Sequence, residues 1–115
     1  MSDQCVFCKI INKQIPSNMV HEDEQVIAFA DIAPQAPTHL LIVPKVHISS
    51  LNELTEEHAH ILGHISLVAK LLAARMGLAE TGWRLVINCG ADAGQTVFHL
   101  HVHLLGGRPL LGQMA

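Results

Sequence analysis

The stretch HLHVHLLGG, residues 99–107, places His99, His101 and His103 at every second position with aliphatic residues between them. Alternate side chains of a β-strand point to the same face, so this spacing predicts three imidazoles on one face of a strand, about 7 Å apart. Histidine is not a preferred strand former, and it titrates and coordinates metals near neutral pH. The pattern therefore predicts a chemical role for the strand rather than packing alone.

The loop GADAGQT leads directly into these histidines. Gly90 and Gly94 allow backbone N–H groups to turn toward an anion, and Gln95 and Thr96 add side-chain donors. Glycines of this kind also simply make turns, so only the adjacent imidazoles favour a phosphate site. A neutral imidazole attacks phosphorus well and can hold the transferred group until water displaces it. Donors on the same face stabilise charge that develops on the phosphoryl oxygens.

Other histidines and cysteines form two further groups. In APTHLLIVPKVHI, His39 and His47 bracket an aliphatic run, which predicts a strand beside the histidine strand and a shared polar cluster. Cys5 and Cys8 have the spacing of a metal site, and no strand precedes them to support a thioredoxin-like redox role. With Cys89 the cysteines are odd in number, which argues against a disulfide framework.

Two metal-binding alternatives remain. The three triad histidines could bind one catalytic metal, although the outer two Cα atoms of a straight strand lie about 13 Å apart, which is wide for ligands about 2 Å from an ion. His60 and His64, at i and i+4 of a helix, could hold a second metal, but exposure on a polar face explains them as well.

The elements that position these residues predict an α+β domain, an antiparallel β-sheet with one long helix and a short N-terminal helix. The connections are too short for most parallel crossovers. The long helix is expected to begin after Thr55 and to end at Gly77. Its core stripe is Ile61, Leu62, Ile65, Val68, Leu72 and Met76. The other expected elements are a helix at 6–13 and strands at 19–22, 25–30, 40–44, 84–90 and 97–105.

Composition limits the class of protein. The 115 residues suit a single domain, 1–115, with an aliphatic core, because half of them are hydrophobic and 15% are charged. The net charge is −3 and no stretch clusters Lys and Arg, so we expect no nucleic-acid partner. No apolar run approaches the length of a membrane span and the N-terminus lacks signal-peptide features, which predicts no membrane association and a cytoplasmic location.

The segments APQAPTHLLIVPKVH and AGQTVFHLHVHLLGGR together resemble the histidine triad nucleotide-binding family, in particular its phosphoramidase branch. The resemblance runs from Cys5 to about Pro109. It implies a purine nucleoside phosphoramidase that acts through a covalent nucleotidyl-histidine and needs no organic cofactor. Alternatives are hydrolysis of dinucleoside polyphosphates, or a nucleotide-binding regulatory module whose turnover is incidental.

The same resemblance assigns residue roles. His101 is implied as the nucleophile, His103 as a contact to the phosphate oxygens, and His39 as a residue behind the nucleophile; His99 completes the catalytic set. Asp31 is implied to accept hydrogen bonds from the ribose. The implied phosphate contacts are Asn88, Gln95 and Thr96, where many relatives have Ser in place of Thr96. The implied apolar slot for the base is Val6, Phe7, Ile10, Phe29 and Ile32, residues that core packing would also explain.

A zinc site and a dimer follow from the resemblance as well. Zinc-containing relatives bind the ion through the positions of Cys5, Cys8, His47 and His99, so a structural zinc is expected here. The family pairs subunits through the long helix and a sheet edge, and Leu67 and Leu71 add apolar surface to that helix. Some relatives end in a tail with a tryptophan, whereas this chain ends RPLLGQMA and its only tryptophan is Trp83. The leaving-group preference is therefore open.

Overall fold

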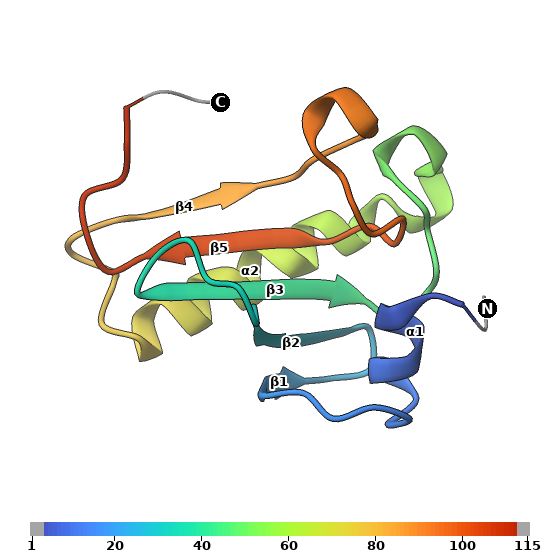
Figure 1. The fold of residues 1–115 in the computed structure, drawn as a ribbon, viewed down its shortest axis with the longest axis horizontal. Helices are drawn as coiled ribbons and strands as arrows, with labels where there is room; N and C mark the ends of the chain where they lie inside the picture. Colours follow the sequence, from blue (N-terminus) through green and yellow to red (C-terminus); the bar gives the residue numbers. More distant parts are fainter. Residues whose placement is uncertain (1–3, 113–115) are drawn as a thin grey trace.

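The computed structural model describes residues 4–112 and contains a five-stranded sheet with one helix on each face (Figure 1). All strand pairs are antiparallel, as the sequence predicts, and the strand order in the sheet is β1-β2-β3-β5-β4. Short 3₁₀ turns lie at Leu51–Glu53, Glu56–His58 and Ala91–Ala93. The helices and strands are α1 (Val6–Ile11), β1 (Met19–Glu22), β2 (Val26–Ala30), β3 (Thr38–Pro44), α2 (His60–Arg75), β4 (Trp83–Val86) and β5 (Val102–Gly106).

The two faces of the sheet carry separate cores. Strand alternation sends Ile42 and Leu104 toward α2, where they pack with Ile65 and Leu72. The opposite face, in front in Figure 1, packs against α1 through a smaller cluster that includes Phe7 and Phe29. β3 contributes to both cores, which confirms the predicted strand buried on both faces.

The register across the α1 face forms one row over all five strands. Met19 on β1 pairs with Phe29 on β2, which pairs with Leu41 on β3, His103 on β5 and then Val86 on β4. Adjacent strands lie about 4.8 Å apart, so this row spans about 14 Å from β5 to β1. Functional side chains far apart in the sequence therefore share one surface.

Several predicted boundaries are wrong. The strand expected at 84–90 is β4, which ends at Val86. The histidine strand is much shorter than 97–105, because β5 begins at Val102 and leaves His99 and His101 outside the ladder. The carbonyl of Ile48 instead accepts a hydrogen bond from the Leu100 N–H at 2.6 Å. Similarly, Thr55 makes no side-chain cap and precedes a 3₁₀ turn, so α2 starts only at His60.

α2 ends just before Gly77, as the sequence predicts, and Gly77 has the positive φ of +76° that favours glycine. The Gly77 N–H bonds the Ala74 carbonyl and the Leu78 N–H bonds the Ala73 carbonyl, the Schellman pattern that satisfies the last carbonyls of a helix. The core stripe holds for the helix interior, but Met76 is 40% exposed. None of the described helices is long and apolar enough to cross a bilayer.

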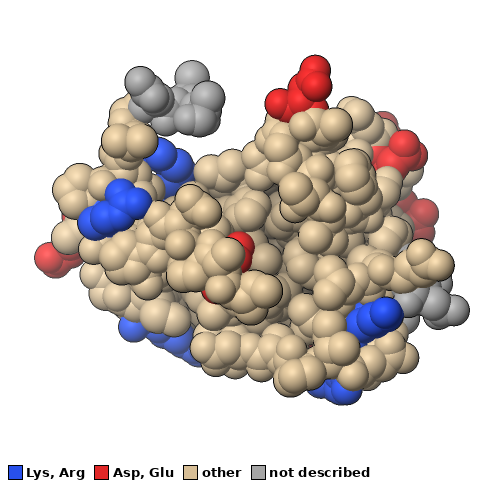
Figure 2. All heavy atoms as spheres, viewed as in Figure 1, with Lys and Arg blue, Asp and Glu red and all other residues tan. Residues whose placement is uncertain are grey.

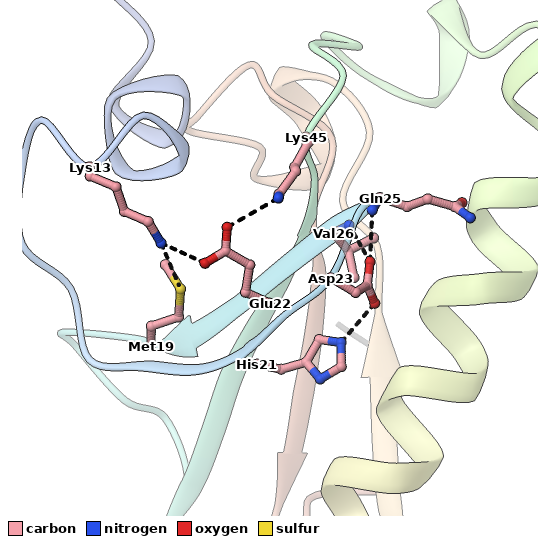
Figure 3. Close-up of polar contacts among 8 residues, drawn as sticks. All are labelled: Lys13, Met19, His21, Glu22, Asp23, Gln25, Val26 and Lys45. Carbon is pink, nitrogen blue, oxygen red and sulfur yellow. Dashed lines mark hydrogen bonds and ion pairs between the residues drawn. The ribbon is translucent and has the colours of Figure 1, made fainter.

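Two adjacent carboxylates at the β1–β2 turn, Glu22 and Asp23, connect the turn to the segment after α1, to the end of β3 and to α2. Glu22 pairs through Oε1 with Lys13 at 2.6 Å and through Oε2 with Lys45 at 3.0 Å (Figure 3). Asp23 accepts the N–H groups of Gln25 and Val26 and also bonds His21 (Figure 3). His64 on α2 bonds the same Asp23 oxygen at 2.8 Å, so this histidine has a structural task, whereas His60 is exposed.

Replacing Asp23 by alanine is expected to lower the free energy of unfolding by about 1–3 kcal/mol at pH 7. Burial raises the Asp23 pKa, but the hydrogen bonds from His21, Gln25, His64 and Val26 outweigh it and hold the pKa well below its usual range. A carboxylate with a depressed pKa stabilises the fold above its unfolded pKa, and the gain is lost as the pH falls through the folded value. Urea unfolding at pH 7 and pH 3 should therefore show a smaller gap between the variant and the wild type at pH 3. An equal gap at both values would contradict this.

Candidate active site

A cavity of about 580 Å³ lies on the α1 face of the sheet and brings together most of the predicted site residues. It is lined by residues from α1, from the segment before β1, from β2 and from the histidine segment. The predicted residues that line it are Val6, Phe7, Ile10, Phe29, Asp31, Ile32, Thr96, His101 and His103. On the side seen in Figure 2, opposite α2, most of the surface carries no charged side chain and the charged groups lie mainly near its margins.

His101 is held by its neighbour in the triad. Its Nδ1 lies 2.7 Å from the His99 carbonyl oxygen, so Nδ1 carries the proton and donates it. The ring also stands edge-on to Phe7, with centroids 5.0 Å apart. In the neutral ring Nε2 is then the nitrogen with a free lone pair, as a nucleophile requires.

His39 and His103 form a second imidazole pair, in which the proton positions are also fixed. The backbone N–H of Gln35 donates to His39 Nδ1 at 3.0 Å, so neutral His39 carries its proton on Nε2. That Nε2 lies 2.9 Å from His103 Nδ1 and donates to it. His103 therefore carries its own proton on Nε2, the remaining nitrogen, as a hydrogen-bond donor. His39 thus contacts His103 rather than lying behind His101.

Burial keeps this pair uncharged. Burial, together with the nearby His101 and His39 rings, lowers the pKa of His103 to about 4 against the raising effect of Asp31. Burial also lowers the pKa of His39, although the Asp31 carboxylate 3.4 Å away opposes the shift. At neutral pH His39 and His103 are consequently uncharged, and His103 can donate its Nε2–H.

Two of the predicted phosphate contacts lie elsewhere. The Gln95 amide donates to the Ser49 and Val97 carbonyls and accepts from the Gly90 N–H, so its hydrogen-bonding capacity holds the loop. Asn88 lines a different cavity and donates to the Ala93 carbonyl at 2.7 Å. Thr96 alone of the three lines the histidine cavity.

Sequence reasoning missed six residues of the cavity wall. Leu41 lies between Phe29 and His103 in the sheet row, and only the strand register could have placed it. Ala30 and Val97 adjoin predicted residues. Pro16, Ser17 and Asn18 form the wall at the β1 side, and no sequence pattern marked them.

The comparisons with known proteins decide the family. Residues 4–111 match the family described as "Scavenger mRNA decapping enzyme C-term binding". Over 110 residues, 96% of this chain and 92% of the relative, the chain is 48% identical to the purine nucleoside phosphoramidase of Escherichia coli. An uncharacterised HIT-like protein of Synechococcus elongatus is 54% identical over 96% of both chains. A HIT family hydrolase from Clostridium thermocellum superposes with a TM-score of 0.97 at 50% identity over the full length of both chains. The chain belongs to the histidine triad family.

A group of four metal-type ligands adjoins the triad. The ligand atoms of Cys5, Cys8, His47 and His99 all lie within 4.8 Å of one another. His99 Nδ1 is 3.3 Å from Cys5 Sγ and 3.5 Å from Cys8 Sγ, and His47 Nδ1 is 3.3 Å from Cys8 Sγ. Two thiols and two imidazoles are a ligand set that tetrahedral zinc accepts.

The hydrogen bond on the far side of the His99 ring suits metal binding. His99 Nε2 donates to the Pro44 carbonyl at 2.7 Å, which leaves the Nδ1 lone pair directed at the two sulfurs. Burial, together with the nearby His47 and His101 rings, lowers the pKa of His99 to about 4 against the raising effect of Pro44, so this lone pair is available at neutral pH.

A second group, Asp31, His39 and His103, also has its ligand atoms within 4.8 Å. In this group the proton that His39 carries on Nε2 is incompatible with a metal ion at that nitrogen. An ion on His39 Nε2 would move the proton to Nδ1, where it would meet the Gln35 N–H. Within residues 4–112 the three triad histidines do not form a metal group either, because His99 turns to the cysteines while His101 and His103 line the cavity. The geometry therefore does not favour the catalytic-metal alternative.

Proposed function

We propose that this protein hydrolyses purine nucleoside 5′-phosphoramidates and releases a nucleoside monophosphate and an amine. The observation that carries the proposal is the hydrogen bond from His101 Nδ1 to the His99 carbonyl, which makes Nε2 the nucleophilic nitrogen of the neutral ring, beside a nucleotide-sized cavity. Nearly half of the residues are identical to those of the E. coli purine nucleoside phosphoramidase, which supports the same substrate class.

The chemistry follows in two steps. His101 Nε2 attacks phosphorus, the P–N bond breaks, and the amine leaves with a proton taken from solvent while the nucleotidyl group remains on Nε2. Water then attacks phosphorus and gives a proton to solvent, the P–Nε2 bond breaks, the electron pair returns to Nε2, and the monophosphate departs. His103 Nε2–H and Thr96 are the donors for the phosphoryl oxygens, and Asp31 is the acceptor for the ribose hydroxyls. Val6, Phe7, Ile10, Phe29 and Ile32 form the slot for the base.

We expect a higher kcat/KM for adenosine or guanosine 5′-phosphoramidates than for dinucleoside polyphosphates. No Lys or Arg of the described chain lines the cavity, and Asp31 is its one carboxylate, so the extra phosphate charges of a polyphosphate find no cationic partner. Steady-state kinetics on both substrate classes, with and without a chelator, test the proposal. A polyphosphate ranked first would contradict it, and so would binding of nucleotides without turnover.

We further propose that Cys5, Cys8, His47 and His99 hold a structural zinc ion. The site residues would bind it through two thiolates and two Nδ1 atoms, and the ion would tie α1 to the segments before and after the active-site loop. Within residues 4–112 no cysteine forms a disulfide, which also suits the cytoplasmic location that we propose.

A homodimer is expected, and light scattering at micromolar concentration should give twice the mass of the chain. β4 is an edge strand, and on α2 Leu67 and Leu71 are 67% and 42% exposed, so a sheet edge and an apolar helix face are both available. Leu67→Glu/Leu71→Glu should shift the mass to that of a monomer. A wild-type monomer would contradict the proposal.

A further inference from the structure

The cavity has polar groups at both of its ends. His101, His103 and Thr96 lie at the β5 side, and Asp31 follows the end of β2. At the β1 side the polar side chains are Ser17 and Asn18, which directly precede Met19. Between the two ends the sheet row presents the apolar side chains of Phe29 and Leu41.

The backbone of Ser17 and Asn18 is held in place, whereas their side chains make no hydrogen bond within the described residues. The Ala30 N–H donates to the Asn18 carbonyl at 3.0 Å, which extends the β1–β2 pairing. Pro16, with its restricted φ, precedes them. Both side chains are exposed, and within residues 4–112 neither has a hydrogen-bond partner. Two hydrogen-bonding groups thus stand at the rim of an otherwise apolar slot.

We propose that Ser17 and Asn18 form a rim that contacts the outer edge of the purine base and so selects purines over pyrimidines. This inference rests on the proposed function, because it needs the phosphate at His101 and His103 and the ribose at Asp31. A base attached to that ribose extends over Phe29 toward β1, and the six-membered ring of a purine is then the part nearest the rim.

The chemistry of the rim accepts both purines. A serine hydroxyl and an asparagine amide each donate and accept. Adenine presents an amino donor beside a ring-nitrogen acceptor, and guanine presents a carbonyl acceptor beside an N–H donor; the rim can satisfy either by reorienting. A pyrimidine is one ring shorter, so its polar edge lies over Phe29 and Leu41, where it loses its water without gaining a partner.

The test compares Ser17→Ala/Asn18→Ala with the wild type on adenosine, guanosine and cytidine 5′-phosphoramidates. In the double variant, kcat/KM for both purines should fall about two- to tenfold, the range for lost hydrogen bonds near a surface. The loss should appear in KM, with kcat retained, since the rim is remote from phosphorus. The cytidine substrate should be unaffected, and the adenosine to guanosine ratio should stay within about twofold.

Gln14→Ala is the matched control, because Gln14 is a polar, exposed residue of the same loop that does not line the nucleotide cavity. It should leave all three substrates unchanged. An equal loss for cytidine, or no loss for the purines, would overturn the proposal. If the wild type hydrolyses none of the three, the proposed function fails instead. In that case, calorimetry of purine and cytidine monophosphates tests the rim alone. The ratio of purine to cytidine affinity should then be lower in Ser17→Ala/Asn18→Ala than in the wild type.

Discussion

Replacing His101 by alanine should lower kcat on a nucleoside phosphoramidate by more than about a thousandfold, because the covalent path is lost with the nucleophile. The fold should persist. The His101 ring lies at the cavity wall, and its neighbours are held independently of it, Leu100 by the Ile48 carbonyl and His99 by the Pro44 carbonyl. Calorimetry should find nucleoside monophosphate affinity within about tenfold of the wild type, since Asp31, Thr96 and the apolar slot remain.

His60→Ala is a suitable control for this experiment, because it removes an exposed imidazole from the α2 side of the sheet. It should leave kcat unchanged. Rapid quenching during turnover in denaturant at alkaline pH, where a P–N bond to imidazole survives, followed by mass measurement, should show one nucleotidyl group on the wild-type chain and none on His101→Ala. A folded His101→Ala protein that keeps most of its activity would exclude His101 as the nucleophile.

The sheet, its order of elements and both helices could be predicted from hydrophobic periodicity because tertiary packing agrees with it. The aliphatic run at 40–44 became β3 at the centre of the sheet, and its neighbour is the histidine strand, as the bracketing His39 and His47 indicated. The pattern was strongest where a strand or helix buries a regular face, as in Ile61, Ile65 and Leu72.

Periodicity failed at 97–101, where alternation continues but the strand does not. This segment is held by side chains and by another loop: Gln95 bonds the Ser49 carbonyl, Leu100 bonds Ile48, and the His99 ring bonds Pro44. Such contacts join residues about fifty positions apart, and no local pattern records them. The role of His39 was also hidden from local patterns. Its ring contacts His103, 64 positions away, and its tautomer is fixed by the Gln35 N–H, which belongs to a loop.

His99 joins the metal group to the nucleophile through two different parts of one residue. Its ring nitrogen faces Cys5 and Cys8, and its carbonyl oxygen accepts the His101 Nδ1–H. Because β5 does not extend to His99, strand hydrogen bonds do not fix this carbonyl. A metal on the ring would restrain the residue in their place, so metal occupancy should affect both stability and the orientation of His101.

We expect about one zinc ion per chain in protein purified without added metal, and none in Cys5→Ser/Cys8→Ser. A metal that binds the folded state at a thousand times its Kd adds about 4 kcal/mol to the free energy of unfolding. Its loss should lower the Tm by about 10 °C or more for a chain of this size. Elemental analysis and thermal unfolding measure the two effects.

Cys89→Ser is the matched control, since Cys89 is the third cysteine of the chain and lies outside the metal group. It should keep both the zinc and the Tm. In the double serine variant kcat should fall further than nucleotide affinity, because the His99 carbonyl no longer holds His101 while Asp31 and Thr96 still bind the nucleotide. The two readouts separate a structural metal from a catalytic one: removing a catalytic metal would abolish turnover and leave the Tm nearly unchanged. Metal-free wild-type protein with full stability and activity would instead mean that the four residues pack together without needing an ion.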